Sequence, residues 1–174
     1  PGSISDAFGA HECVPCGGGT FQPLANATAC LPCEPGSICP VGASAPLPCQ
    51  AGSFSSATDL AHQSECSPCP PGSSCSTGSV MPTPCAPGTA SAASDSPLCD
   101  ACPAGRYQPN HNATDCLPCE RGSHCSEGAS AALPCESGTY GDATNLTRAD
   151  ECVSCPTGWA CPTGAELPEE CGAG

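Results

Sequence analysis

The sequence contains no lysine and only three arginines against 17 acidic residues, so its formal net charge is −14. Nucleic acids and anionic membranes attract basic surfaces, and this charge therefore excludes both as electrostatic partners. The acidic residues do not form an Asp-x-Asp-x-Asp-Gly loop, which excludes the common calcium-binding loop. We interpret the acidity as a means of keeping an exposed chain soluble.

Long apolar runs and large apolar side chains are also scarce. No run is long enough for a transmembrane helix or a signal peptide, so we expect no membrane insertion and a segment of a longer chain. Helical periodicity is absent, and prolines interrupt the short alternating stretches. Ordering a residue costs about 1.5 kcal/mol of conformational entropy, and three Phe, two Tyr and one Trp supply little apolar surface to offset it.

Cysteine, glycine and proline are abundant instead, at 20, 20 and 22 residues. Cysteine at this density indicates a disulfide scaffold in an oxidising compartment. We therefore expect an extracellular location, either secreted or on the cell or ciliary surface. Three Asn-x-Thr sequons in predicted loops indicate N-linked glycans at Asn26, Asn112 and Asn145.

An internal repeat organises the chain. Shifting the sequence by 86 residues superposes cysteines on cysteines, for example Cys33 on Cys119 and Cys49 on Cys135. Repeats of this kind are supersecondary units that abut one another. We predict a partial loop of a preceding repeat at 1–12, a first super-repeat at 13–98, and a second at 99–174 that is cut in its last loop.

Each super-repeat contains two kinds of loop. The longer kind opens with Cys-x-x-Gly-x and an aromatic residue and closes at a cysteine after 13 or 16 intervening residues. We expect the glycine to turn the chain and the aromatic residue to lie against a disulfide. One loop has Ala90 in this place, which predicts the weakest local core. The aromatic positions are Phe21, Phe54, Tyr107 and Tyr140.

The shorter kind of loop consists of a cysteine, five residues and a second cysteine. A Gly- and Pro-rich strip follows it, and such a strip favours extended backbone. The predicted fold class is therefore small and disulfide-rich. It is an elongated tandem array of cysteine-stapled loops with short two-stranded ribbons and little regular secondary structure.

Sequence alone does not fix the cysteine connectivity. We favour local pairing, in which each loop closes on itself and Cys13 and Cys171 bond to cysteines outside the segment. One alternative pairs each Cys-x-x-Cys internally, and a crossed scheme that joins 33 to 49 and 39 to 66 is the serious rival. The favoured pairs are Cys16 with Cys30, Cys33 with Cys39, Cys49 with Cys66, Cys69 with Cys75, Cys85 with Cys99, Cys102 with Cys116, Cys119 with Cys125, Cys135 with Cys152, and Cys155 with Cys161.

The loop motif resembles a known family. The stretch Cys102–Tyr107 (Cys-Pro-Ala-Gly-Arg-Tyr), followed by Cys116–Cys119 (Cys-Leu-Pro-Cys), is similar to the ephrin-receptor-like cysteine-rich repeat. A single loop also resembles the first small module of tumour necrosis factor receptor repeats. The resemblance covers essentially the whole segment and implies disulfide-stapled extracellular rods of receptors, matrix proteins and protist surface proteins. The interposed short loops depart from the receptor pattern. The same motif is matched by Cys49, Gly52, Phe54, Cys66 and Cys69.

No set of residues predicts catalysis, a metal site or a cofactor. Six Cys-x-x-Cys pairs have a spacing that zinc sites also use, but the sequons and the cysteine density favour disulfides. A redox role needs a thioredoxin-like strand and helix around the motif, which are missing. The histidines have no nucleophile arranged beside them, and we expect no enzyme. These histidines are His11, His62, His111 and His124.

Two functions of different classes remain. We prefer a structural rod segment of a large secreted or surface glycoprotein, as part of an extracellular filament, because the 86-residue super-repeat is regular. The lysine-free, alanine-rich composition resembles that of a green-algal protein, and algal ciliary-hair (mastigoneme) glycoproteins contain similar cysteine-rich stretches. The partners of the rod segment would be other protein chains, including copies of itself. The alternative is a receptor or adhesion ectodomain that binds a protein ligand through its cysteine-rich repeats. Non-repeated exposed aromatic residues would favour that alternative, and only Phe8 and Trp159 qualify.

Overall fold

Loops and very short strands make up almost all of the structure. The computed structural model describes residues 1–5 and 11–172, so Phe8 lies outside the described residues. The described strands are two residues long, and the two helices are single turns of 3₁₀ type. The elements are β1 (Ser3–Ile4), β2 (Val14–Pro15), β3 (Thr20–Phe21), β4 (Leu31–Pro32), β5 (Ser37–Ile38), β6 (Leu47–Pro48), β7 (Ser53–Phe54), η1 (Gln63–Glu65), β8 (Ser67–Pro68), β9 (Ser73–Ser74), β10 (Thr83–Pro84), β11 (Thr89–Ala90), β12 (Asp100–Ala101), β13 (Arg106–Tyr107), β14 (Leu117–Pro118), β15 (Ser123–His124), β16 (Leu133–Pro134), β17 (Thr139–Tyr140), η2 (Ala149–Glu151), β18 (Val153–Ser154), β19 (Trp159–Ala160) and β20 (Glu169–Glu170).

The strands pair into antiparallel two-stranded ribbons. In β3–β4, Phe21 lies opposite Leu31, and in β13–β14, Tyr107 lies opposite Leu117. A proline often ends the second strand, because it lacks the N–H that a longer ladder needs. Short loops also form ribbons, such as β5–β6, where the sequence indicated only a tight turn and an extended strip. The predicted small, disulfide-rich fold with short ribbons is confirmed.

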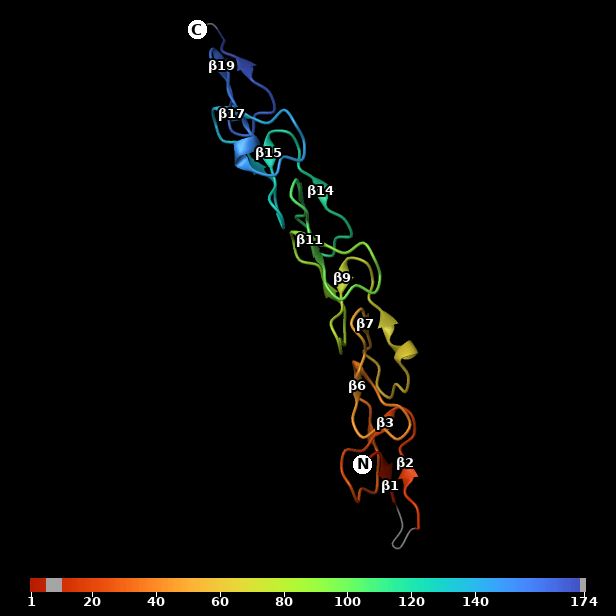
Figure 1. Cartoon of the computed structure of the whole chain (residues 1–174). Helices are drawn as coiled ribbons and strands as arrows, with labels where there is room; N and C mark the ends of the chain where they lie inside the picture. Colours follow the sequence, from red (N-terminus) through yellow and green to blue (C-terminus); the bar gives the residue numbers. More distant parts are fainter. Residues whose placement is uncertain (6–10, 173–174) are drawn as a thin grey trace. The chain divides into compact units, whose positions relative to one another are not determined.

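The chain forms two compact units, which Figure 1 traces in sequence colours. The first contains Pro1–Thr83 and Ala93–Leu98, and the second contains Pro84–Ala92 and Cys99–Gly174. Within the second unit, the ribbons from β13–β14 to β19–β20 follow one another in chain order. No helix in the described ranges has the length and apolar character to cross a membrane. The super-repeat boundaries at 13 and 99 stay a prediction.

Cysteines occupy the positions that large apolar side chains fill in an ordinary core. Leucines, by contrast, lie largely at the surface: the exposed fraction is 45% for Leu31 and 44% for Leu117. Disulfides therefore replace apolar packing as the source of order, as expected for a chain with so little apolar surface. The largest fully buried side chains belong to Cys16, Cys33, Cys39, Cys49, Cys69, Cys75, Cys85, Cys102, Cys119, Cys125 and Cys135.

Backbone hydrogen bonds join successive loops within each unit. In the first unit the Gly19 N–H donates to the Cys39 carbonyl, and in the second the Gly105 N–H donates to the Cys125 carbonyl, both at 2.8 Å. Gly105 has a φ of +84°, and a Cβ at this residue would lie 2.6 Å from the carbonyl oxygen of Asn145. Glycine satisfies both the positive φ and the close approach. The register of the loops thus depends on backbone groups, which leaves most side chains free to vary.

Two of the long loops contain three extra residues, which form η1 and η2. Glu65 Oε2 accepts hydrogen bonds from the backbone N–H groups of His62 (2.8 Å) and Ala61 (2.6 Å). Glu151 accepts the Thr147 N–H at 2.6 Å and the Thr147 hydroxyl at 2.8 Å. These bonds lower the pKa of both carboxyls, because they favour the ionised form. The largest contribution comes from the backbone N–H of His62 for Glu65 and from that of Thr147 for Glu151.

Candidate functional site

Nine disulfides close the described loops, each joining the two cysteines that bound one loop. The Cα atoms of the bonded cysteines are 5.6–6.0 Å apart, within the usual range for disulfides. This is the loop-local connectivity, and it is neither the crossed scheme nor the internal pairing of Cys-x-x-Cys motifs. The bonds are Cys16 to Cys30, Cys33 to Cys39, Cys49 to Cys66, Cys69 to Cys75, Cys85 to Cys99, Cys102 to Cys116, Cys119 to Cys125, Cys135 to Cys152, and Cys155 to Cys161.

The remaining two cysteines, Cys13 and Cys171, are exposed and have no disulfide partner among residues 1–5 and 11–172. Their bonding to cysteines outside the segment stays a prediction. A zinc site built from Cys-x-x-Cys pairs would need thiolates, and every such pair has at least one sulfur in a disulfide. Within the described part of the chain, His, Cys, Asp and Glu residues do not gather in groups of three or more that could hold a metal ion.

Among residues 1–5 and 11–172, each unit contains an apolar cluster that is built against a disulfide. In the first unit, Ile38 packs with Cys49 and Cys66, and Leu60 covers them. In the second unit, Ala90 packs with Cys102 and Cys116, and Ala113 covers them. The second cluster has alanine at both places where the first has a larger side chain.

A hollow of about 260 Å³ opens beside Ala90, in the second unit. The β11–β12 ribbon forms one wall, where Ala90 lies opposite Asp100 rather than the aromatic–leucine pair of β3–β4 and β13–β14. The Cys102–Cys116 loop forms the other wall. We call this feature the Ala90 hollow. It is lined by Ala90, Ala92, Asp100, Ala101, Pro103, Arg106, Thr114, Asp115 and Cys116.

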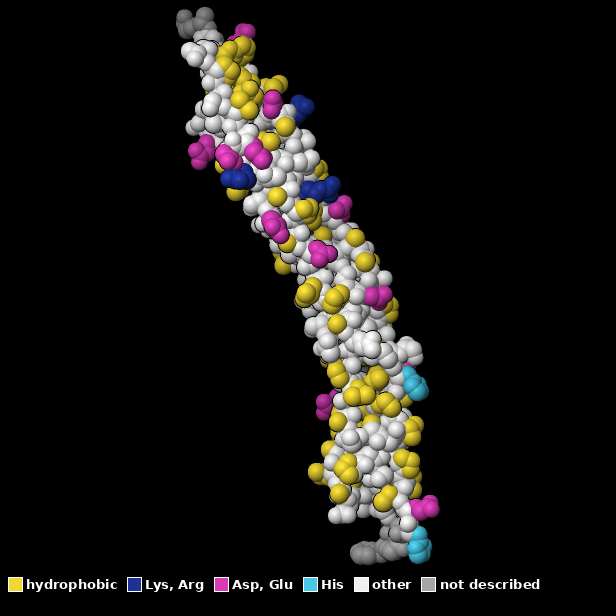
Figure 2. Space-filling view, in the orientation of Figure 1, with side chains coloured by type: hydrophobic (Ala, Val, Ile, Leu, Met, Phe, Trp, Pro, Cys, Tyr) yellow, Lys and Arg dark blue, Asp and Glu magenta, His cyan; other side chains and the backbone are white. Residues whose placement is uncertain are grey.

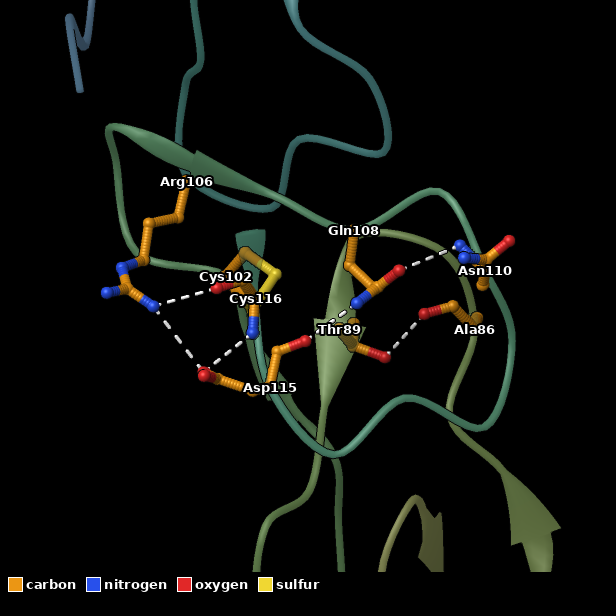
Figure 3. The surroundings of a disulfide bond; sticks show 8 residues. All are labelled: Ala86, Thr89, Cys102, Arg106, Gln108, Asn110, Asp115 and Cys116. Carbon is orange, nitrogen blue, oxygen red and sulfur yellow. Dashed lines mark hydrogen bonds and ion pairs between the residues drawn. A yellow bond between two sulfur atoms is a disulfide. The ribbon is translucent and has the colours of Figure 1, made fainter. Parts of the chain in front are cut away.

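Two of the residues that line the Ala90 hollow, Arg106 and Asp115, are charged and form an ion pair (Figure 3). The Arg106 guanidinium donates to the Cys116 carbonyl at 2.7 Å and lies 3.5 Å from the Asp115 carboxylate. Both side chains of the ion pair are well exposed, 44% for Arg106 and 86% for Asp115. A pair this exposed contributes little stability, so its charges are available to a binding partner.

The wall on the side of the Cys102–Cys116 loop is held by a buried glutamine. The Gln108 amide donates to the Asp115 carbonyl at 2.7 Å and accepts the Asn110 N–H at 3.0 Å (Figure 3). Gln22 makes the same two kinds of bond in its own loop, to the Ala29 carbonyl and from the Leu24 N–H. Sequence reasoning missed this role, although a glutamine follows the aromatic residue at both places, 86 residues apart.

The face shown in Figure 2 has no extended apolar or single-sign patch in either unit. Hydrophobic side chains appear there as small separate groups, and the few basic side chains lie near acidic ones. Isolated surface apolar groups are normal in proteins. The Ala90 hollow is therefore the candidate site in the described chain, since it combines concave shape, an apolar floor and charged groups in its lining.

The three sequon asparagines lie in the long loops, and all three are exposed. Each has a positive φ, 59° at Asn26, 58° at Asn112 and 61° at Asn145. Asparagine tolerates this left-handed conformation better than most residues. Sequence reasoning placed these residues in loops but did not anticipate their shared backbone conformation.

A family model described as TNFR/NGFR cysteine-rich region matches residues 102–139. The matched stretch lies in the second unit. It contains the Cys102–Cys116 and Cys119–Cys125 loops, including Arg106 and Asp115 at the Ala90 hollow. The resemblance to tumour necrosis factor receptor modules is thus confirmed for this stretch, and the algal and mastigoneme context stays without support. No curated protein matches the chain.

Proposed function

We propose that this chain is part of an extracellular receptor or adhesion ectodomain that binds a protein ligand through its cysteine-rich loops. The observation that carries the proposal is the match of residues 102–139 to the TNFR/NGFR cysteine-rich region. The disulfide framework agrees with an extracellular or cell-surface location. From the sequence alone we preferred a structural filament to a receptor. The family match supports the receptor hypothesis, which we therefore now prefer.

The Ala90 hollow is the proposed contact point within this ectodomain. It lies partly in the matched stretch, and its floor is formed by alanines and a disulfide that do not fill the space. One apolar side chain of the ligand would fit there, since interface energy concentrates where an anchor side chain enters a pocket. The carboxylates of Asp100 and Asp115, which line the hollow, and the formal charge of −14 favour a ligand with a basic surface.

A binding assay on the secreted, disulfide-bonded chain tests this function. The probes are individually purified extracellular proteins with basic surfaces. The measured quantity is the dissociation constant, obtained by fitting a saturable binding isotherm. Ala90→Phe, which introduces an aromatic residue as in the four other long loops, should fill the hollow and weaken binding at least tenfold. Leu133→Ala, an exposed change elsewhere in the second unit, should leave the affinity unchanged and serves as the matched control.

Two results would count against the proposal. If Ala90→Phe binds as tightly as the parent chain, the hollow is not the contact point. If no probe binds and the chain instead self-associates with increasing concentration in sedimentation velocity, the filament hypothesis replaces the receptor one. That second candidate is favoured by one observation, the tandem 86-residue repeat of cysteine positions.

A further inference from the structure

Every long loop has an asparagine or aspartate ten residues after its opening cysteine, and each of these residues has a positive φ. The φ values lie between 58° and 63°, in the left-handed region that Asn and Asp tolerate best among residues with a Cβ. Either residue therefore satisfies the backbone. The five residues are Asn26, Asp59, Asp95, Asn112 and Asn145.

The residue two positions later depends on whether the loop has Asn or Asp. The three loops with Asn have Thr28, Thr114 and Thr147 at this place. The two loops with Asp have Ala61 and Pro97 instead. A left-handed residue does not require a threonine two positions on, whereas the N-glycosylation acceptor Asn-x-Thr requires both residues. The correlation thus points to glycan acceptance rather than to turn geometry.

Backbone hydrogen bonds anchor Asn112 and Asn145, and both residues face solvent. The Asn112 N–H donates to the Cys85 carbonyl at 2.9 Å, and the Asn145 N–H donates to the Cys119 carbonyl at 2.8 Å. Asn26 is exposed in the same way as Asn112 and Asn145. A glycan on the side-chain nitrogen would extend into solvent without breaking the backbone bonds that join the loops.

We infer that Asn26, Asn112 and Asn145 are N-glycosylation sites, and that Glu151 limits how fully Asn145 is modified. The donor is an oligosaccharide linked through diphosphate to a membrane lipid. The asparagine amide nitrogen attacks C1 of the first sugar, so a C–N bond forms and the C–O bond to the diphosphate breaks. The nitrogen loses one proton, the lipid diphosphate leaves with the bonding electron pair, and no oxidant or reductant is needed.

Asn145 differs from the other two sites because its threonine is held by another side chain. The Thr147 hydroxyl donates to Glu151 Oε1 at 2.8 Å, and the Thr147 N–H donates to Oε2 at 2.6 Å. The threonines of the other two sites are exposed, whereas Thr147 is half-buried. A transferase has to engage this threonine together with the asparagine. Asn145 is therefore glycosylated only before the hydrogen bonds between Glu151 and Thr147 form. Its glycan occupancy should be the lowest of the three sites.

The test is site-specific glycopeptide mass spectrometry on the 174-residue chain secreted from a eukaryotic host. The expected result is a glycan on most copies of Asn26 and Asn112 and on fewer copies of Asn145. Glu151→Ala should raise the occupancy of Asn145 to that of Asn112, and the neighbouring change Asp150→Ala should not. Bare Asn26 and Asn112, in a host that modifies a control glycoprotein, would overturn the assignment. Full occupancy of Asn145 in the parent chain would overturn the role of Glu151.

Matched variants separate acceptance of the glycan from folding. Asn112→Asp keeps a residue type that two other loops use at this place, so it should remove one glycan mass and leave the disulfide map unchanged. Asp95→Asn combined with Pro97→Thr should add a glycan in a loop that lacks one. If that variant keeps the parent disulfide map and stays unmodified, this loop position is not an acceptor and the inference fails. None of these outcomes depends on ligand binding.

Discussion

The two apolar clusters are both built on the disulfide of a long loop, but they contain different amounts of apolar side chain. In both, a ribbon residue two positions after a loop glycine packs on the disulfide of the following long loop. In both, the covering residue directly follows the left-handed Asx residue of that loop. Ile38 and Leu60 fill the first cluster, whereas Ala90 and Ala113 leave the second one open.

This difference separates two contributions that are usually combined in a protein core, the bonds that determine the chain path and the apolar packing that adds local stability. The disulfide loops around the two clusters differ in length, but each loop closes on itself and equivalent backbone bonds join the loops, from the Cys49 N–H to the Gly36 carbonyl and from the Cys102 N–H to the Gly88 carbonyl. These shared bonds account for the chain path. The apolar side chains differ, so they adjust local stability and surface shape. A loop whose path is fixed covalently tolerates the loss of its filling, and the vacated space becomes a hollow that a ligand side chain can enter.

Removing a disulfide should have the largest effect, and a similar one at both clusters. Cys102→Ser with Cys116→Ser, and Cys49→Ser with Cys66→Ser, should each lower the local free energy of unfolding by about 2–5 kcal/mol. The reason is that each loop loses the cross-link that restricts its unfolded state. Hydrogen exchange of the loop amides measures this directly. Equal protection before and after the change at either cluster would show that packing, rather than the disulfide, maintains that loop.

Changing the apolar side chains should lower the local stability of the first cluster and raise that of the second. Ile38→Ala removes buried side-chain atoms and should cost about 2–5 kcal/mol in the first cluster. Ala90→Ile fills the hollow and should add about 0.5–2 kcal/mol in the second. The measurement is again amide exchange in the adjacent loop, with exposed Leu133→Ala as the control expected to have little effect. A loss of stability in Ala90→Ile would mean that the hollow has no room for a larger side chain.

Two loop glycines of the second unit test the close backbone contacts between loops. Gly138→Ala introduces a Cβ with no atom within 4 Å, so it should cost only the positive-φ penalty of about 1–2 kcal/mol. Gly105→Ala carries the same penalty and also a Cβ 2.6 Å from the Asn145 carbonyl oxygen. The additional overpacking should cost about 1–3 kcal/mol more. Thermal unfolding of the two variants compares them. Equal destabilisation would show that the contact between loops contributes nothing.

The smallest effect should come from acid, through a carboxyl in the loop of the first cluster. The loop of the first cluster contains Glu65, whose pKa is lowered by the backbone N–H groups of His62 and Ala61. Because the folded pKa is below the unfolded one, the stabilisation is present above the unfolded pKa and disappears as pH falls through the folded pKa. NMR titration should show the His62 amide shifting at a lower pH than an ordinary glutamate titrates. In Glu65→Gln this shift should vanish, and its persistence would implicate another group.

Much of the fold could be predicted from the spacing of the cysteines, because tandem disulfide loops place cysteines at regular intervals in the sequence. The ribbons at Phe21 and Tyr107 followed from the Cys-x-x-Gly-x-aromatic motif. The one departure from that motif, Ala90, predicted a weak local core, and the hollow lies beside this residue. In such a chain the covalent frame and the turn glycines carry most of the structural information.

The remaining features depend on contacts between loops, which spacing does not reveal. The close approach of Gly105 to Asn145 brings together residues 40 positions apart. The buried role of Gln108 requires knowing that its amide reaches the Asp115 carbonyl. The left-handed Asn and Asp residues do have a signal in the sequence, which is their fixed distance from each opening cysteine, but only the three asparagines also belong to a sequon.

Loop-local disulfides, rather than an apolar core, determine the path of this chain. Non-reducing peptide mass spectrometry of the secreted, natively oxidised protein tests this most directly. Loop-local pairing predicts nine cross-linked peptide pairs, including Cys49 with Cys66 and Cys102 with Cys116. Bonds within the Cys-x-x-Cys motifs, or the crossed bonds of Cys33 to Cys49 and Cys39 to Cys66, would contradict it.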